Sequence, residues 1–143
     1  MEDIFSVRAA LEAHAVALAV ERAGPALAEP LERINQRFAA AAEVPDFAAI
    51  NDFNREFHVV ILNSADNDHL KRFLEDAWLR CARYRAGFRL IPGRRTSAVA
   101  EHEAIIAAVR AGDAEGAARA ARAHVEVAGR GMAEYLDTAV AEA

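Results

Sequence analysis

Four of the five histidines in this 143-residue chain fall on predicted apolar faces of helices, namely His14, His58, His102 and His124. Neutral imidazole is the commonest metal ligand in proteins, whereas histidine has no particular preference for apolar cores. Facing helices of a bundle commonly supply the ligands of a metal site. Three such histidines in one bundle are therefore candidates for a shared metal site. The alternative is that each is a separate, hydrogen-bonded structural histidine.

Asn54 shares a helix face with His58, because the two residues are four positions apart. The apolar residues of this segment alternate at spacings of three and four around Asn54, as one helix face does. They are Phe47, Ile50, Phe57 and Ile61. Burying an unpaired polar group costs about 1–3 kcal/mol. Asn54 and His58 therefore need partners from other parts of the fold.

The elements that position these residues are predicted to be helices. The composition is rich in alanine, leucine, glutamate and arginine, and no segment alternates like a strand. The predicted helices span residues 3–23, 26–43, 47–63, 68–88, 97–110 and 114–136. Their connections are short, which favours antiparallel neighbours. We therefore predict a single all-α domain over residues 1–143, an antiparallel bundle of six to seven helices.

The larger apolar residues predict which face of each helix is buried. In the first helix this face comprises Ile4, Val7, Leu11, His14 and Leu18. In the fourth helix it comprises Leu70, Phe73, Leu74, Ala77, Trp78 and Cys81. His14 and Trp78 are thus expected in the core. His69 follows the turn before the fourth helix and is expected to be exposed.

Composition excludes several classes of function. The net charge is -5, the only lysine is Lys71, and the arginines are interspersed with acidic residues. Binding of nucleic acid by this chain alone is therefore not expected, since it usually requires a basic patch. No apolar stretch is long enough to span a membrane, and the acidic start is unlike a signal peptide. Cys81 is the only cysteine, which indicates a reducing, cytoplasmic setting.

A set of short motifs resembles one known family when the motifs are taken together and in order. They are Arg8-Ala9-Ala10-Leu11-Glu12, Asn54-Arg55-Glu56-Phe57-His58, Ser64-Ala65-Asp66-Asn67-Asp68-His69-Leu70, Glu101-His102-Glu103-Ala104-Ile105, Ala111-Gly112-Asp113 and Ala120-Ala121-Arg122-Ala123-His124. The chain resembles the C-terminal effector-binding domain of GntR-family transcription regulators of the FadR type, the FCD domain. The resemblance covers about residues 4–136. It implies a helical bundle around a polar central cavity.

The resemblance also implies site residues. Many family members hold a divalent metal, such as zinc or nickel, with one acidic residue and three histidines. His58, His102 and His124 take the histidine places, and Asn54 takes the place of the acidic residue. Arg8 falls at a position that contacts the acid group of the effector in several members, although an Arg8–Glu12 pair is the simpler role. Apart from the resemblance, the fourth helix offers further candidates for effector binding in Arg80, Arg83, Tyr84 and Arg85, of which Arg83 and Tyr84 are the preferred pair.

Asn54 is the departure from the family that matters. An amide oxygen is neutral and a weaker donor than a carboxylate, so a bound dication would lack one negative charge. We expect weaker metal binding and a preference for an anionic ligand such as an effector carboxylate. A site that holds only water and hydrogen bonds is the alternative.

The expected function is therefore ligand sensing and homodimerisation in a transcription regulator, with a small organic acid as effector. DNA binding would need a winged helix-turn-helix, which this chain lacks, and its start inside a helix favours an excised domain. A metal-dependent hydrolase or hydratase is a competing function, because three histidines also form catalytic sites. Against it, Glu56 and Glu101 are expected to point away from the site, which leaves no obvious base. A helical interaction domain without a ligand is the third possibility.

Overall fold

The computed structural model describes residues 1–143 and contains helices but no strands. The principal helices are α1 (Glu2–Ala23), α2 (Ala28–Glu43), α3 (Phe47–Ala65), α4 (Asp68–Arg80), α6 (Arg94–Arg110) and α7 (Ala114–Glu142). A short helix α5 (Gly87–Leu90) and two 3₁₀ turns, η1 (Gly24–Leu27) and η2 (Ala82–Tyr84), connect them. The all-α prediction is confirmed, and the fold is a helical bundle.

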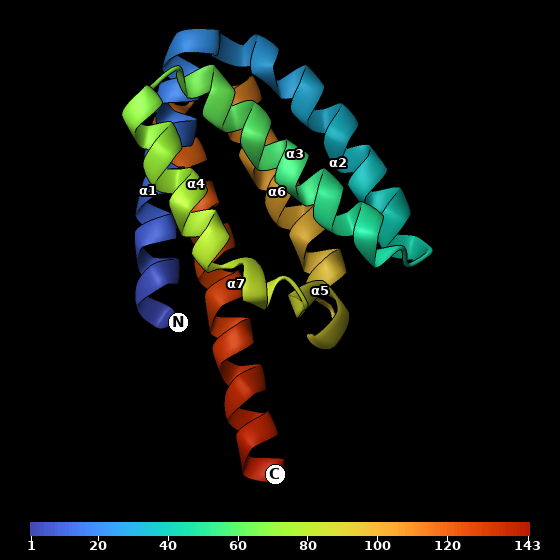
Figure 1. The fold of residues 1–143 in the computed structure, drawn as a ribbon. Coiled ribbons are helices and arrows are strands. Elements are labelled where there is room, and N and C mark those ends of the chain that lie inside the picture. The colour runs from blue at the N-terminus through green and yellow to red at the C-terminus, as the bar shows by residue number, and fades with distance from the viewer.

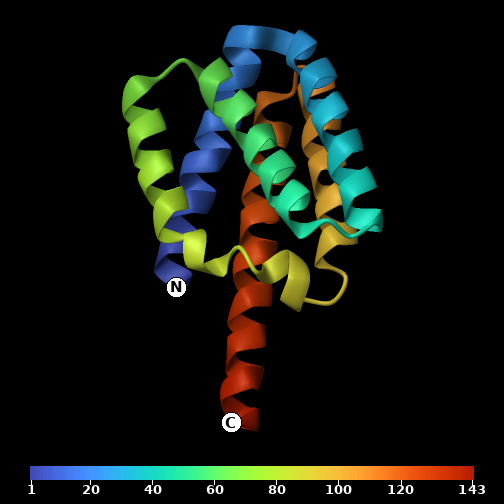
Figure 2. The same ribbon diagram turned by 45° about the vertical axis from the view of Figure 1, so that its right-hand side comes forward.

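The long helices run up and down beside one another, and the C-terminal half of α7 projects beyond the others (Figures 1 and 2). Helix α1 packs along α7, and α3 lies between α1 and α2. The core is continuous through the upper part of the bundle, where residues from α1, α2, α3, α4, α6 and α7 pack together. Helices α3, α6 and α7 therefore surround a common interior, in which polar side chains must find partners. No helix is both long enough and apolar enough to cross a membrane.

Local sequence explains where several helices begin. The side chains of Asp46, Asn67 and Asp113 each accept a hydrogen bond from a backbone N–H in the first turn of α3, α4 and α7. These caps satisfy donors that a helix start leaves unpaired. Pro30 lies in the first turn of α2, where its missing N–H has no cost. The cap at Asp46 fixes the start of the helix that carries Asn54 and His58.

The predicted buried face of α1 is only partly correct, because Ile4, Leu11 and Leu18 pack against the core but are only partly buried. Val7 is 51% exposed, and His14, expected in the core, is also exposed. The buried face instead consists mainly of small residues with one carboxylate, and comprises Phe5, Ala9, Glu12, Ala13, Ala15, Val16, Ala19 and Val20. Small side chains let α1 approach its neighbours closely, because interaxial distance depends on the side chains at the contact. Alanine occurs on every side of α1, so the larger residues were a poor guide to its orientation.

The predicted fourth helix also differs from the structure. It was expected to continue from residue 68 to residue 88, but α4 ends at Arg80 and the chain turns through η2 into α5. Trp78 and Cys81 are buried as expected, whereas Phe73 is 64% exposed. Helices α6 and α7 are longer than predicted, beginning at Arg94 and ending at Glu142. The break after Arg80 matters because it places the next residues across the end of the central cavity.

Candidate metal and effector site

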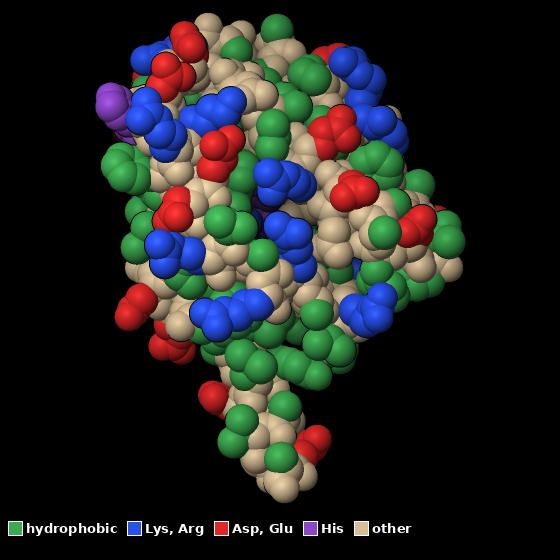
Figure 3. Space-filling model, viewed as in Figure 1, with side chains coloured by type: hydrophobic (Ala, Val, Ile, Leu, Met, Phe, Trp, Pro, Cys, Tyr) green, Lys and Arg blue, Asp and Glu red, His purple; other side chains and the backbone are tan.

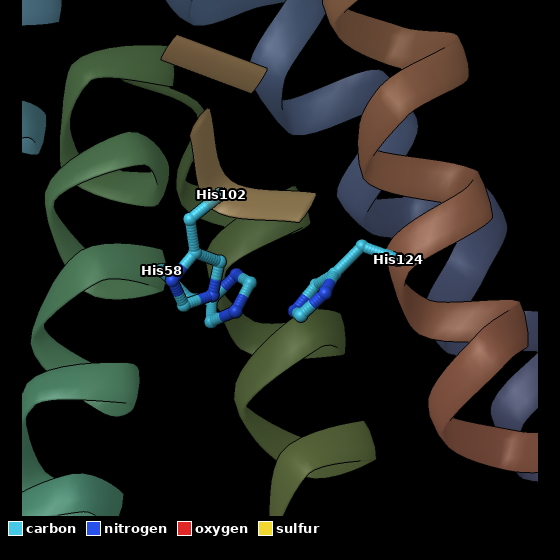
Figure 4. Close-up of side chains that lie close together, drawn as sticks. All are labelled: His58, His102 and His124. Carbon is cyan, nitrogen blue, oxygen red and sulfur yellow. The ribbon is translucent and has the colours of Figure 1, made fainter. Parts of the chain in front are cut away.

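Three histidines converge in the interior of the bundle. His58 comes from α3, His102 from α6 and His124 from α7, and each offers a ring nitrogen within 4.8 Å of those of the other two (Figure 4). All three side chains are buried. The ring centroids of His102 and His124 are 4.8 Å apart, and those of His58 and His124 are 5.2 Å apart. These three side chains lie close enough together to hold one metal ion.

Asn35 of α2 determines the tautomer of His102. The side-chain amide of Asn35 donates to the carbonyl oxygen of Val99 at 3.2 Å, so its Oδ1 is free to accept. That oxygen lies 2.9 Å from Nδ1 of His102, which must therefore carry the proton. The lone pair of His102 is then on Nε2. The ring is held in place by Phe57, which stacks on it with centroids 4.2 Å apart.

Glu101 acts in the same way on His124. Its Oε1 lies 2.7 Å from Nδ1 of His124, which assigns the proton to Nδ1 and the lone pair to Nε2. Arg94, which is only 5% exposed, holds the carboxylate with two hydrogen bonds of 3.0 Å each. The expectation that Glu101 points away from the site is thus incorrect. Glu56 does point away, pairing with Arg37 at 3.1 Å on the surface.

Glu12 of α1 is the acidic neighbour of His58. Its Oε1 accepts hydrogen bonds from Nε1 of Trp78 at 2.6 Å and from Nε of Arg8 at 3.2 Å. The same oxygen lies 3.8 Å from Nδ1 of His58, which is an electrostatic contact rather than a hydrogen bond. Arg8 thus pairs with Glu12, as the simpler reading of the sequence expected.

The electrostatics of the site keep all three imidazoles neutral. Burial is the main reason that the pKa of each lies below its usual value. For His102 and His124 the shift is large, and neighbouring histidines and Arg94 add to it. Burial would raise the pKa of Glu12, but Arg8, His58 and the Trp78 hydrogen bond together lower it to about 2. Neutral imidazoles beside ionised carboxylates are the protonation states that metal ligation requires.

Several buried polar atoms at the site have no hydrogen-bond partner within the protein. Among them are Nε2 of His58, Nε2 of His102 and Oδ1 of Asn54. Buried acceptors of this kind are costly unless something occupies the space they face. Two imidazole nitrogens and an amide oxygen are donors suited to zinc or nickel. The residues present therefore fit a divalent metal.

A cavity leads to these residues from the surface. It has two adjoining lobes of about 120 and 90 Å³, which share Arg8, Asn51, Asn54, Cys81 and Arg85 as lining residues. His58 lines the first lobe, and His124 the second. Basic side chains border the hollow on this face of the molecule (Figure 3). The volumes are below the roughly 300 Å³ typical of drug-sized ligands, so the space suits a small metabolite.

The expected effector residues are placed differently with respect to this cavity. Arg8 lines both lobes, and Tyr84 lines the second. Arg83 is exposed and lines a separate groove on the outer side of α1, with its guanidinium 5.2 Å from the ring centroid of Tyr84. Arg85 takes the position on the cavity wall that was expected for Arg83. His69 is exposed, as predicted.

Three residues that contact the site were not identified as such from the sequence: Glu12, Asn35 and Arg94. For two of them a signal exists. Glu12 lies within the three-and-four spacing of Phe5, Ala9 and Val16, and Asn35 within that of the buried face of α2. A polar residue inside an apolar helix face is the same signal that identified Asn54. Arg94 follows a turn at the start of α6, where no periodicity exists to orient it.

The chain is similar to known proteins over most of its length. The family model described as the FCD domain matches residues 3–127. The solved structure of E. coli McbR/YncC has a TM-score of 0.81 with this chain and 25% sequence identity, covering 95% of this chain and 67% of the McbR/YncC chain. No curated protein matches the chain.

Proposed function

Because this chain belongs to the FCD-domain family, the effector-binding domains of GntR-type transcription regulators, we propose that it senses a small organic acid together with a divalent metal. The metal would be zinc or nickel, held by Asn54, His58, His102 and His124. The acid would enter the two-lobed cavity beside Arg8, Tyr84 and Arg85. Binding there would change the packing of the bundle, and that change is the signal.

One observation carries the proposal. Three buried imidazoles share a space in which their ligand atoms lie within 4.8 Å of one another, and the lone pairs of His58 and His102 have no partner in the protein. Three histidines placed only for packing would be expected to satisfy one another or neighbouring groups. Here Asn35 and Glu101 accept hydrogen bonds from the outer ring nitrogens of His102 and His124. The inner nitrogens are then available, as they are in metal-ligating histidines that donate their other N–H to an oxygen.

The charges around the site support an anionic effector. Asn54 and the three imidazoles are all neutral donors. The two nearby carboxylates are already balanced, since Glu12 pairs with Arg8 and Glu101 pairs with Arg94. A dication at this site would therefore keep an uncompensated positive charge in a buried setting, which is costly. The carboxylate of a small acid supplies the missing charge.

The proposal predicts one divalent metal per chain and a metal-dependent response to organic acids. Metal content is measured on protein purified without chelator. Thermal unfolding is then followed with a panel of small carboxylic acids, with and without a chelator. An acid present at 100 times its dissociation constant adds roughly 2.7 kcal/mol to the free energy of unfolding. Uncharged amides of the same acids serve as controls and are expected to have little effect.

Two outcomes would count against the proposal in different ways. If the protein binds neither zinc nor nickel in titration, the proposed metal site is wrong. A shift that is equal for the acids and their amides would remove the anionic effector.

The cavity wall supplies a matched pair of variants, because Arg83 and Arg85 are both exposed and only Arg85 lines the cavity. We expect Arg85→Gln to weaken acid binding about 5–10-fold, as loss of a partly solvated charge contact costs roughly 1 kcal/mol. Arg83→Gln is expected to bind like the unaltered protein. The measurement is titration of the best acid from the panel. Equal losses in the two variants would indicate a general effect of net charge.

The proposal also assigns the chain a role in homodimerisation in the cytoplasm, as a single domain. DNA contact is assigned to a winged helix-turn-helix outside these residues. Catalysis is not part of the proposal, because Glu101, the carboxylate hydrogen-bonded to His124, is held in an ion pair by Arg94, which disfavours its use as a general base.

A further inference from the structure

The carboxylate of Glu12 occupies an unusual position for a helix-surface ion pair. A glutamate and an arginine four residues apart usually pair on the solvent side of a helix, where the pair contributes a few tenths of a kcal/mol. Here the side chain of Glu12 is 5% exposed and that of Arg8 is 15% exposed. One carboxylate oxygen, Oε2, has no partner at all. Burying an ionised carboxylate on these terms costs free energy, which points to a role for Glu12 beyond its pairing with Arg8.

The contacts of Glu12 fix its orientation. Trp78 of α4 and Arg8 of α1 both donate to Oε1, so the carboxylate cannot rotate without losing two hydrogen bonds. The same oxygen faces Nδ1 of His58 at 3.8 Å. A negative oxygen at this distance favours the tautomer with the proton on Nδ1, because the opposite tautomer would point a lone pair at it. The inner nitrogen of His58, Nε2, then carries the lone pair.

Each of the three histidines thus has an oxygen facing its outer nitrogen, and each oxygen comes from a different helix. Asn35 of α2 accepts a hydrogen bond from His102 at 2.9 Å, and Glu101 of α6 accepts one from His124 at 2.7 Å. Glu12 of α1 makes the longer electrostatic contact with His58 at 3.8 Å. Only His58 depends on α1. The arrangement of these oxygens is complete without any residue from outside the chain.

We propose that Glu12 is the positioning residue for His58, holding its imidazole in the Nδ1–H tautomer and presenting Nε2 to the metal, while it also holds Arg8 on the cavity wall. This inference rests on the proposed metal site. The Arg8–Glu12 pair would thus influence metal and effector binding although neither residue contacts the metal. It also makes α1 part of the site through a single side chain.

The test compares Glu12→Gln with Glu21→Gln, which removes the same charge from an exposed position of the same helix. Nitrogen-15 NMR of the imidazoles in the chelator-treated protein reads the tautomer of His58 directly. Zinc affinity is measured separately by competition with a chromophoric chelator. We expect Glu12→Gln to shift His58 away from the Nδ1–H tautomer and to weaken zinc binding about 10–100-fold. Glu21→Gln is expected to change neither.

The two readouts separate failure of this inference from failure of the proposed function. If the unaltered protein binds no zinc, the proposed metal site is wrong, and the tautomer measurement still judges the role of Glu12. If zinc binds and Glu12→Gln keeps both the tautomer and the affinity, Glu12 is not a positioning residue. Should Glu12→Gln fail to fold because Arg8 is left unpaired, the double variant Arg8→Gln/Glu12→Gln removes the charge pair together and is expected to give the same two changes.

Discussion

Replacement of His102 by alanine is expected to abolish metal binding and to destabilise the fold. His102 is fully buried, its ring stacks on Phe57, and its Nδ1–H donates a hydrogen bond to Asn35 that fixes the orientation of the ring. Loss of one of three imidazoles leaves two neutral nitrogens and an amide oxygen, which is too weak a set to retain zinc or nickel. Removing the ring also leaves a cavity and an unpaired amide oxygen on Asn35. Together these cost about 2–5 kcal/mol in the free energy of unfolding.

The two effects of His102→Ala are measured separately. Metal content per chain reports the site, and urea unfolding in the presence of a chelator reports packing without any contribution from metal. His69→Ala is the matched control, because His69 is exposed and outside the cluster; it is expected to change neither quantity. Full metal content in a folded His102→Ala protein would show that the metal is held by other residues.

Acid is expected to destabilise the metal-free protein steeply, beginning near pH 6.5. The pKa values of His58, His102 and His124 are lowered in the fold, chiefly by burial. Below pH 6.5 the unfolded chain binds protons that the folded state does not, so the stability these groups provide is present above pH 6.5 and is lost as the pH falls. Each histidine contributes about 1.4 kcal/mol per pH unit, and three together about 4 kcal/mol per pH unit at most.

Glu12 acts in the same direction at lower pH. Its pKa is lowered from 4.5 to about 2, so the stability it provides is present above pH 4.5 and is lost as the pH falls towards 2. The histidine effect is measured by urea unfolding with chelator at a series of pH values from 8 to 5, and the Glu12 effect by extending the series below pH 4.5. The exposed His14 gives a control, since His14→Gln should keep the same dependence on pH. A free energy of unfolding that stays constant between pH 7.5 and 5.5 would contradict the buried, neutral cluster.

Periodicity predicted the fold class and placed four histidines on apolar faces, but one of them, His14, is exposed in the structure. The family resemblance was needed to single out the other three. His58, His102 and His124 lie on such faces, and the structure brings them together. Periodicity also identified Asn54. The caps at Asp46 and Asp113 were predictable because their chemistry is local.

Other features were not predictable from periodicity, for identifiable physical reasons. The orientation of α1 is set by close packing of alanines, which the larger residues Val7 and His14 do not reveal. The helix break after Arg80 exchanges Arg83 for Arg85 at the cavity, and no glycine or proline marks it in the sequence. The hydrogen bonds that His102 and His124 make to Asn35 and Glu101, and the electrostatic contact between Glu12 and His58, depend on which helices lie side by side. That is a property of the assembled bundle.

The neutral amide of Asn54 has a thermodynamic consequence for the proposed sensor. With a carboxylate at this position, a metal could bind tightly whether or not an acid is present. With an amide, the two ligands depend on each other, and by linkage the factor by which the acid strengthens metal binding equals the factor by which the metal strengthens acid binding. The domain would then respond to the product of two concentrations and act as a coincidence detector, with Asn54 as the residue that makes both inputs necessary.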